Sequence, residues 1–263
     1  MIENIDHLIH KELKNRFDSL LNSEPVLRKI ISDINTDRVF ILGGFVRDVI
    51  NGGNSRDLDL LVDVSARELD IILRKNNCGV FCNRLGGAKL TFGQMEVDVW
   101  SIENNWAFKN QLVKLNEKDK LHSIAKGCFF NYDALVVSLP EYFFDIRFYQ
   151  DFVRNNELDI IQKRPIYKKQ NPTVEANIIR AVYIQKTQQI RFSKNLIDYL
   201  YNEVLALNDL YGDALRRIMM IKQQYPKYSK VSEEDMKNAI QGLFDSQQAS
   251  LFDEENKCVF LVS

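Results

Sequence analysis

Residues 39–64 read VFILGGFVRDVINGGNSRDLDLLVDV and carry the most informative pattern in the chain. The apolar run VFIL is followed by Gly43 and Gly44, which is typical of a buried strand that ends in a tight turn. The residues after the turn favour a short helix, and the run DLDLLV at 57–62 favours a second strand. The segment therefore predicts a strand, a glycine turn, a helix and another strand in immediate succession.

Two aspartates are expected to share one face of the second strand. Alternate side chains of a strand point to the same side, so Asp57 and Asp59 face one way while Leu58 and Leu60 face the other. The Cβ atoms of the two aspartates should lie roughly 6.5 to 7 Å apart. That spacing suits two metal ions about 3.5 to 4 Å apart, and carboxylates are the hard ligands that Mg²⁺ prefers. The strand therefore predicts a site for Mg²⁺ or Mn²⁺.

The glycine turn and the aspartate pair together resemble the head domain of the polymerase beta superfamily of nucleotidyltransferases. Within that superfamily the chain is most similar to class II CCA-adding enzymes and bacterial poly(A) polymerases. Their signature, Gly-Gly-x-Val-Arg-Asp followed by Asp-x-Asp, is matched by Gly43, Gly44, Val46, Arg47, Asp48, Asp57 and Asp59. The resemblance implies an α+β fold, in which a mixed polymerase beta-like sheet with flanking helices is followed by a small all-α neck domain.

The expected domain boundary follows from this comparison. Residues 1–155 should form the nucleotidyltransferase head, including amphipathic N-terminal helices over residues 2–34. Residues 156–263 should form the neck-like helical domain with an acidic C-terminal segment. The last strands of the head are expected at 136–139 and 142–148. Helices are expected in the second domain at 174–187, 194–205, 211–223 and 232–244.

The resemblance also implies a third carboxylate on a neighbouring strand. The run from Met95 to Ile102 predicts that strand, with Glu96, Asp98 and Trp100 on one face. Asp98 is the preferred candidate because its Val-Asp-Val-Trp context is similar to related sequences, and Glu96 is the alternative. Asp57, Asp59 and Asp98 are thus the expected catalytic and metal-binding residues.

The expected nucleotide contacts are less complete than in the related enzymes. Backbone N–H groups of Gly43 and Gly44 suit phosphate, and Arg47 and Arg56 are expected to help. The family's Arg-Arg-Asp-Phe-Thr-Ile-Asn-Ala-Leu motif is matched only by its Phe and Ala-Leu, within 127–135. Lys126 is expected to replace the missing arginines as a single phosphate contact, although it lacks their bidentate fork.

The neck motif is also only partly matched. Arg180 stands at the family's second arginine, where an ion pair within the neck and an RNA or phosphate contact are both open. The family's base-selecting Glu-Asp-x-x-Arg is not found in the sequence.

Charge is unevenly distributed although the formal net charge is −1. Residues 160–230 contain thirteen Lys and Arg against five acids, whereas residues 231–263 contain seven acids against two Lys. The basic segment predicts either an RNA-binding surface or the solvated face of a helical bundle. No apolar run approaches 18 residues and no signal-peptide core is visible, so we expect a cytoplasmic chain without a membrane partner. The four cysteines lack zinc-site spacing and are expected to be free thiols.

Three functions are compatible with the sequence. The preferred one is metal-dependent transfer of a nucleoside monophosphate from an NTP to an RNA 3′ end, tRNA-like as the resemblance implies, with pyrophosphate leaving. The second is the same chemistry on a protein side chain or a small molecule. The third is a pseudoenzyme that binds nucleotide or RNA. The identity of the NTP and the oligomeric state are not determined by the sequence.

Overall fold

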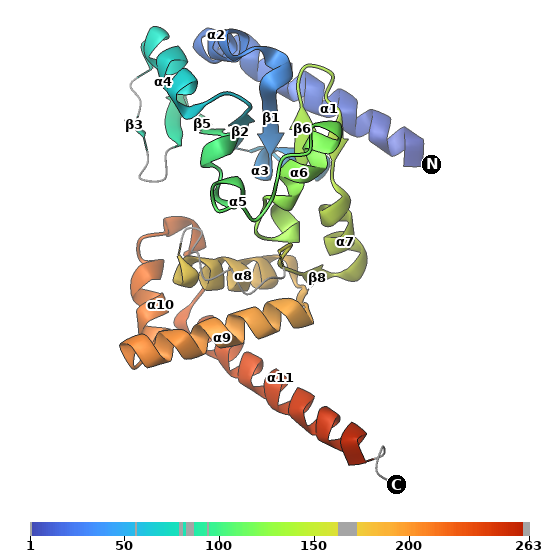
Figure 1. Cartoon of the computed structure of the whole chain (residues 1–263), viewed down its shortest axis with the longest axis vertical. Helices are drawn as coiled ribbons and strands as arrows, with labels where there is room; N and C mark the ends of the chain where they lie inside the picture. Colours follow the sequence, from blue (N-terminus) through green and yellow to red (C-terminus); the bar gives the residue numbers. More distant parts are fainter. Residues whose placement is uncertain are drawn as a thin grey trace. The chain divides into compact units, whose positions relative to one another are not determined.

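The structure is a computed structural model that describes residues 2–55, 57–78, 81–82, 87–93, 95–162 and 173–259. The chain divides into two compact units, Met1–Asp151 and Phe152–Ser263 (Figure 1). None of the helices in the described part of the chain combines the length and apolar character needed to cross a membrane.

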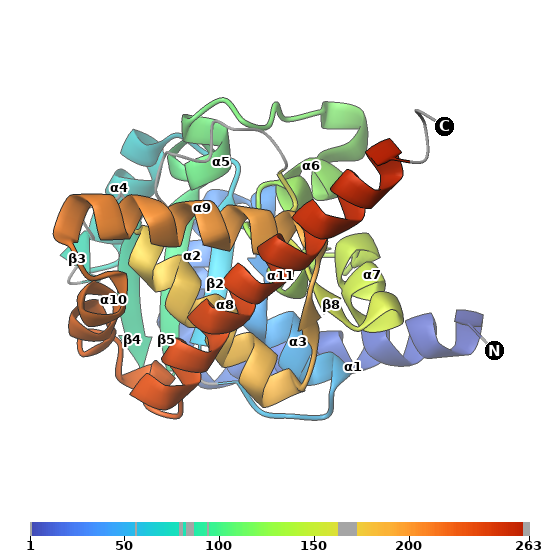
Figure 2. The ribbon, with the colours of Figure 1, turned by 90° about the horizontal axis from the view of Figure 1, so that it is seen from below.

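The first unit is built on a seven-stranded sheet in the order β3-β4-β5-β2-β1-β6-β7. Strands β2 and β5 are parallel, whereas each of the other neighbouring pairs is antiparallel, so the sheet is mixed as expected. Figure 2 shows β4, β5 and β2 side by side. The strands are β1 (Val39–Leu42), β2 (Asp57–Val62), β3 (Phe81–Cys82), β4 (Ala88–Phe92), β5 (Met95–Ser101), β6 (Val136–Ser138) and β7 (Phe144–Asp145).

Helices flank this sheet. They are α1 (Ile2–Ser23), α2 (Pro25–Ile34), α3 (Gly44–Ile50), α4 (Ala66–Lys75), α5 (Trp106–Lys109) and α6 (Lys120–Lys126). Helix α7 (Arg147–Asn155) contains the boundary between the two units. Helices α3 and α4 contact the sheet, and α1 and α2 pack against them. Their buried side chains, including Leu13, Phe17, Leu27 and Leu69, form the core together with the apolar residues of the strands.

Helix α7 corrects one expectation, because residues 142–148 were expected to be a strand. The strand is limited to Phe144–Asp145, and the helix begins at Arg147. The Asp145 carboxylate accepts a hydrogen bond from the Arg147 backbone N–H at 3.0 Å, which satisfies one of the N–H groups that a helix start leaves without a partner. The aromatic residues of this segment suggested a strand, and the capping role of Asp145 was missed.

The second unit is mainly helical rather than all-α. Its helices are α8 (Val174–Gln188), α9 (Lys194–Tyr211), α10 (Ala214–Lys222) and α11 (Glu233–Val259). All four were expected, but α9 and α11 were expected to end earlier, at 205 and 244. A short parallel ladder of β8 (Glu157–Leu158) and β9 (Arg191–Phe192) was not expected. Helix α8 is anchored by the buried Glu175, whose carboxylate lies 2.7 Å from the Arg217 guanidinium of α10.

Candidate active site

The three candidate carboxylates lie on adjacent strands. In the parallel pair of β2 and β5, Asp57 is opposite Glu96 and Asp59 is opposite Asp98. Directly paired residues point to the same side of a sheet, so all four acids share one face. Leu58 and its neighbours on the other face are buried, whereas the acids are exposed or half-exposed. The structure therefore brings together the acids that the sequence identified.

A lysine that was not identified from the sequence lies on the same face. Lys89 of β4 is opposite Asp98, and its Nζ lies 2.6 Å from the Glu96 carboxylate. The hydrogen bond to Glu96 raises the pKa of Lys89, and the negative charges of Asp98 and Asp57 raise it further. Glu96 and Asp98 both lie on this face, so the choice of Asp98 as the third carboxylate stays a prediction.

The donor set fits a hard divalent cation. Asp57, Asp59 and Asp98 offer only carboxylate oxygens, the ligand type of Mg²⁺ and Mn²⁺. Within the described residues, no group of three or more His, Cys, Asp or Glu is already gathered as a metal-binding cluster. The side chains thus have the right chemistry and face, and the metal site itself stays a prediction.

The glycine turn lies at the same end of the sheet as Asp57. Because Leu42, the last residue of β1, pairs with Asp59, the turn that follows it runs beside the start of β2. Gly43 has a φ of 60° and a ψ of −114°, a conformation that only glycine adopts without strain. Its N–H donates to the Leu135 carbonyl at 2.9 Å, so this N–H already has a partner. The amide of Gly44, at the start of α3, is the better placed of the two for phosphate.

Arg47 is held beside this turn by contacts that the sequence did not predict. Its Nη1 lies 3.2 Å from the Asp133 carboxylate, and its Nε is 4.0 Å from the Asp48 carboxylate. The guanidinium also stacks on the Tyr132 ring, with Cζ 4.1 Å from the ring centroid. Only 16% of the Arg47 side chain is exposed. Any phosphate contact from Arg47 must therefore be made alongside its pairing with Asp133.

Three further residues were expected to contact phosphate or RNA, namely Lys126, Arg56 and Arg180. Lys126 is exposed at the last position of α6. Arg56 lies outside the described residues. Arg180 belongs to the second unit, where its Nη1 is 3.4 Å from the hydroxyl of Tyr228. Arg180 is thus integrated into the helical unit.

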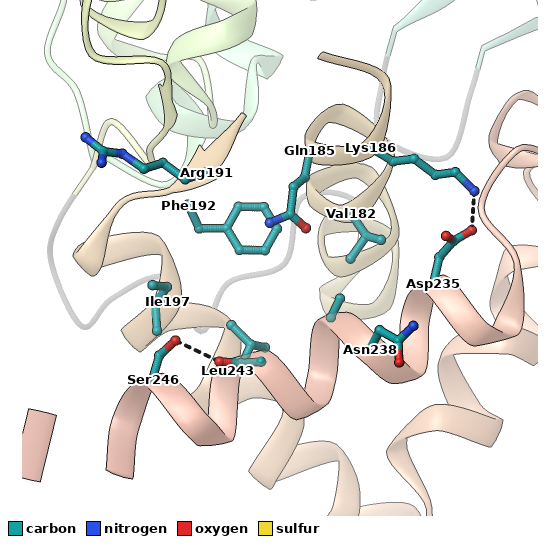
Figure 3. A pocket seen from close by; sticks show the side chains of 12 residues that line it. Val182, Gln185, Lys186, Arg191, Phe192, Ile197, Asp235, Asn238, Leu243 and Ser246 are labelled. Atoms are coloured by element: carbon teal, nitrogen blue, oxygen red, sulfur yellow. Dashed lines mark hydrogen bonds and ion pairs between the residues drawn. The ribbon is translucent and has the colours of Figure 1, made fainter. Parts of the chain in front are cut away.

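The helical unit contains a pocket of about 450 Å³ (Figure 3). Figure 3 shows Lys186 of α8 and Asp235 of α11 paired at one side, and Phe192 beside Gln185 at another. The Lys186 ammonium and the backbone N–H and hydroxyl of Ser232 lower the pKa of Asp235 to about 2. The pocket is lined by residues of this unit alone, and no site residue expected from the sequence lines it.

No protein-family model matches this sequence, and no curated protein matches it either. The structure is similar to solved structures of CCA-adding enzymes. One bound to ATP matches 86% of this chain and 52% of its own length, with 16% identity and a TM-score of 0.59. A CCA-adding enzyme in an apo form matches 86% of this chain and 51% of its own, with 18% identity and a TM-score of 0.58.

A tRNA nucleotidyltransferase complexed with a primer tRNA and an incoming ATP analogue is also similar. It matches 78% of this chain and 57% of its own length, with 17% identity and a TM-score of 0.51. The chain thus spans about half the length of the solved structures that it matches. At these identities the likeness concerns the fold, and the resemblance drawn from the glycine turn and the aspartate pair is confirmed at that level: the chain has the polymerase beta-like nucleotidyltransferase fold of the CCA-adding enzymes.

Proposed function

We propose that the chain is a metal-dependent nucleotidyltransferase that moves a nucleoside monophosphate from an NTP onto the 3′ hydroxyl of an RNA. The observation that carries this proposal is the shared exposed face of Asp57, Asp59 and Asp98, next to the Gly43-Gly44 turn. Three acids on one face offer the carboxylate oxygens that hard divalent cations prefer. A binding module gains little from such an arrangement, whereas phosphoryl transfer depends on it.

In this reaction the acceptor oxygen forms a bond to the α-phosphorus and the hydroxyl proton passes to water. The bond from that phosphorus to the bridging oxygen breaks, releasing pyrophosphate. Asp57 and Asp59 would hold the metal ions, with Asp98 completing the second position. When bound, these ions neutralise the triphosphate and lower the pKa of the attacking hydroxyl.

The residues of the turn would orient the nucleotide. The first N–H groups of α3, with Arg47 beside them, would bind the β and γ phosphates, since helix starts favour anions. Most of the catalysis would then come from position and charge rather than from covalent chemistry. RNA is the proposed acceptor because the residues 160–230 are basic and because two fold neighbours are a CCA-adding enzyme with ATP and a nucleotidyltransferase with a primer tRNA.

The direct test is transfer of labelled nucleotide. ATP, CTP, GTP and UTP are offered separately with Mg²⁺ or Mn²⁺, and with a tRNA transcript that lacks its 3′-terminal nucleotides. Asp59→Asn removes one charge at constant shape, and Asp70→Asn, on the exposed side of α4, is the matched control. We expect label on RNA with the wild type and Asp70→Asn, and none with Asp59→Asn.

Two results would select another function. Label on protein, when cell extract is added, would identify a protein acceptor for the same chemistry. Nucleotide binding that needs no metal, survives Asp59→Asn and leads to no transfer would identify a pseudoenzyme and refute the proposal.

A further inference from the structure

Lys89 is a basic group on an otherwise acidic face. It lies on β4, directly opposite Asp98 of β5, and its ammonium lies 2.6 Å from the Glu96 carboxylate. About 45% of its side chain is exposed. An ammonium carries three hydrogen-bond donors, so one bond to Glu96 does not exhaust its capacity. Lys89 can therefore contact a ligand that approaches the carboxylates from solvent.

The order of the strands shows from which side such a ligand would come. Strands β1, β2, β5 and β4 are consecutive in the sheet. The Gly43-Gly44 turn follows β1, Asp57 and Asp59 lie on β2, Asp98 lies on β5, and Lys89 lies on β4. The glycine turn and Lys89 thus flank the carboxylates on opposite sides.

This arrangement separates the two substrates of the proposed reaction. If the triphosphate binds at the glycine turn, the acceptor hydroxyl must approach the α-phosphorus from the opposite side, because attacking and leaving oxygens lie in line. That side is the one on which Asp98 and Lys89 lie. An RNA acceptor carries its nearest phosphodiester next to the attacking 3′ hydroxyl, and so brings an anion close to β4.

We propose, on the basis of the function proposed above, that Lys89 binds the 3′-terminal phosphodiester of the RNA acceptor and so favours a nucleic-acid acceptor over an uncharged one. The Glu96 carboxylate holds the ammonium on this face. Lys89 is a binding residue in this reaction and not a metal ligand.

The test measures acceptor and nucleotide dependence separately. Lys89→Met removes the charge and retains the apolar stem, and Lys89→Arg retains the charge. Lys75→Met is the matched control, because Lys75 is also an exposed lysine in an ion pair, 3.0 Å from Asp33. We expect Lys89→Met to raise the KM for the RNA about tenfold, as for loss of one charge-assisted hydrogen bond. The KM for the NTP should change less than twofold, and Lys89→Arg should restore most of the loss.

A second substrate distinguishes direct contact from a structural role. An RNA oligonucleotide whose last linkage is a neutral methylphosphonate lacks the charge that Lys89 would bind. Wild type and Lys89→Met should then have the same acceptor KM, whereas on the natural oligonucleotide the mutant should also show a salt dependence weaker by about one unit of slope.

Two outcomes would contradict the role of Lys89. An equal loss on both oligonucleotides, or an unchanged acceptor KM in Lys89→Met, would refute the role of Lys89 while leaving the proposed function intact. Absence of transfer by the wild type on any RNA would refute the proposed function, and this inference with it.

Discussion

Asp59 and Asp98 are direct neighbours across the parallel strands β2 and β5, although the two strands are far apart in the sequence. Both side chains are half-exposed on the face that also carries Asp57. Asp98 is also directly opposite Lys89 of β4, so this face carries a cation beside its acids.

Removal of the Asp59 charge tests whether Mg²⁺ binds at these carboxylates. We expect Asp59→Asn to bind Mg²⁺ more weakly than the wild type, because a charged carboxylate ligand is replaced by a neutral amide. Mg²⁺ at one hundred times its Kd should stabilise the wild type by about 2.7 kcal/mol and leave Asp59→Asn almost unchanged. Thermal unfolding with and without Mg²⁺ measures both effects. A full Mg²⁺ shift in Asp59→Asn, equal to that of Asp70→Asn, would show that the metal binds elsewhere.

The Arg47 contacts should contribute measurably to stability. Arg47→Ala leaves the Asp133 carboxylate, 19% exposed, without this partner and removes the stack on Tyr132. We expect a loss of about 1 to 3 kcal/mol in the free energy of unfolding, measured with urea. Arg38→Ala is the control, because Arg38 and Glu68 form an exposed pair at 3.6 Å that should contribute less than about 0.5 kcal/mol. Equal effects of the two substitutions would show that the Arg47 contacts are not formed in solution.

Gly87 is expected to be intolerant of a side chain. A Cβ at this position would lie 2.5 Å from the Trp100 ring, far inside van der Waals contact. Gly87→Ala should therefore displace Trp100 and cost about 1 to 3 kcal/mol. Tryptophan fluorescence in a Trp106→Phe background reports the displacement, because the chain has only two tryptophans.

Gly242 in α11 is the contrasting position, since nothing lies within 4 Å of a Cβ placed there. Gly242→Ala should raise stability by about 0.5 to 1 kcal/mol, as expected for a helix interior.

If Gly87→Ala left both fluorescence and stability unchanged, the close approach of Gly87 to the Trp100 ring would be wrong.

Acid should weaken the hydrogen bonds that the Asp235 carboxylate accepts from Ser232 at the start of α11. The pKa of Asp235 is lowered to about 2 by Lys186 and Ser232, so its contribution to stability is present above the ordinary pKa near 3.8. That contribution is lost as the pH falls from about 4 toward 2, because the carboxylate then becomes protonated in the folded state. Asp235→Asn should be less stable than the wild type at pH 6, and the difference should shrink over this range. A difference independent of pH in unfolding experiments would contradict this assignment.

Local signals in the sequence predicted the local structure well. The alternation of Asp57, Leu58, Asp59 and Leu60 predicted a strand with one acidic and one apolar face, since side chains alternate in any strand. The structure has this strand, and its two faces differ in burial as expected. The four helices of the second unit were also predicted, although α9 and α11 extend to Tyr211 and Val259 rather than ending at 205 and 244.

Local signals failed where a short segment can adopt two structures. The aromatic residues around 142–148 favour a strand by propensity. Only Phe144–Asp145 forms one, and α7 begins at Arg147. The β8–β9 ladder was missed because each strand has only two residues, too few for any periodicity to be detected.

The sequence by itself determined which residue types are present and which of them share a face within one strand or helix, because both depend only on neighbours along the chain. It also carried the glycine and aspartate motif that identified the fold. Only the tertiary structure decided that Asp98 lies beside Asp59, that the Lys89 ammonium pairs with the Glu96 carboxylate, and that Arg47 pairs with Asp133. These relations depend on strand register or on contacts between segments that are distant in the sequence. In the strands, a shift of one residue would turn each side chain to the opposite face of the sheet.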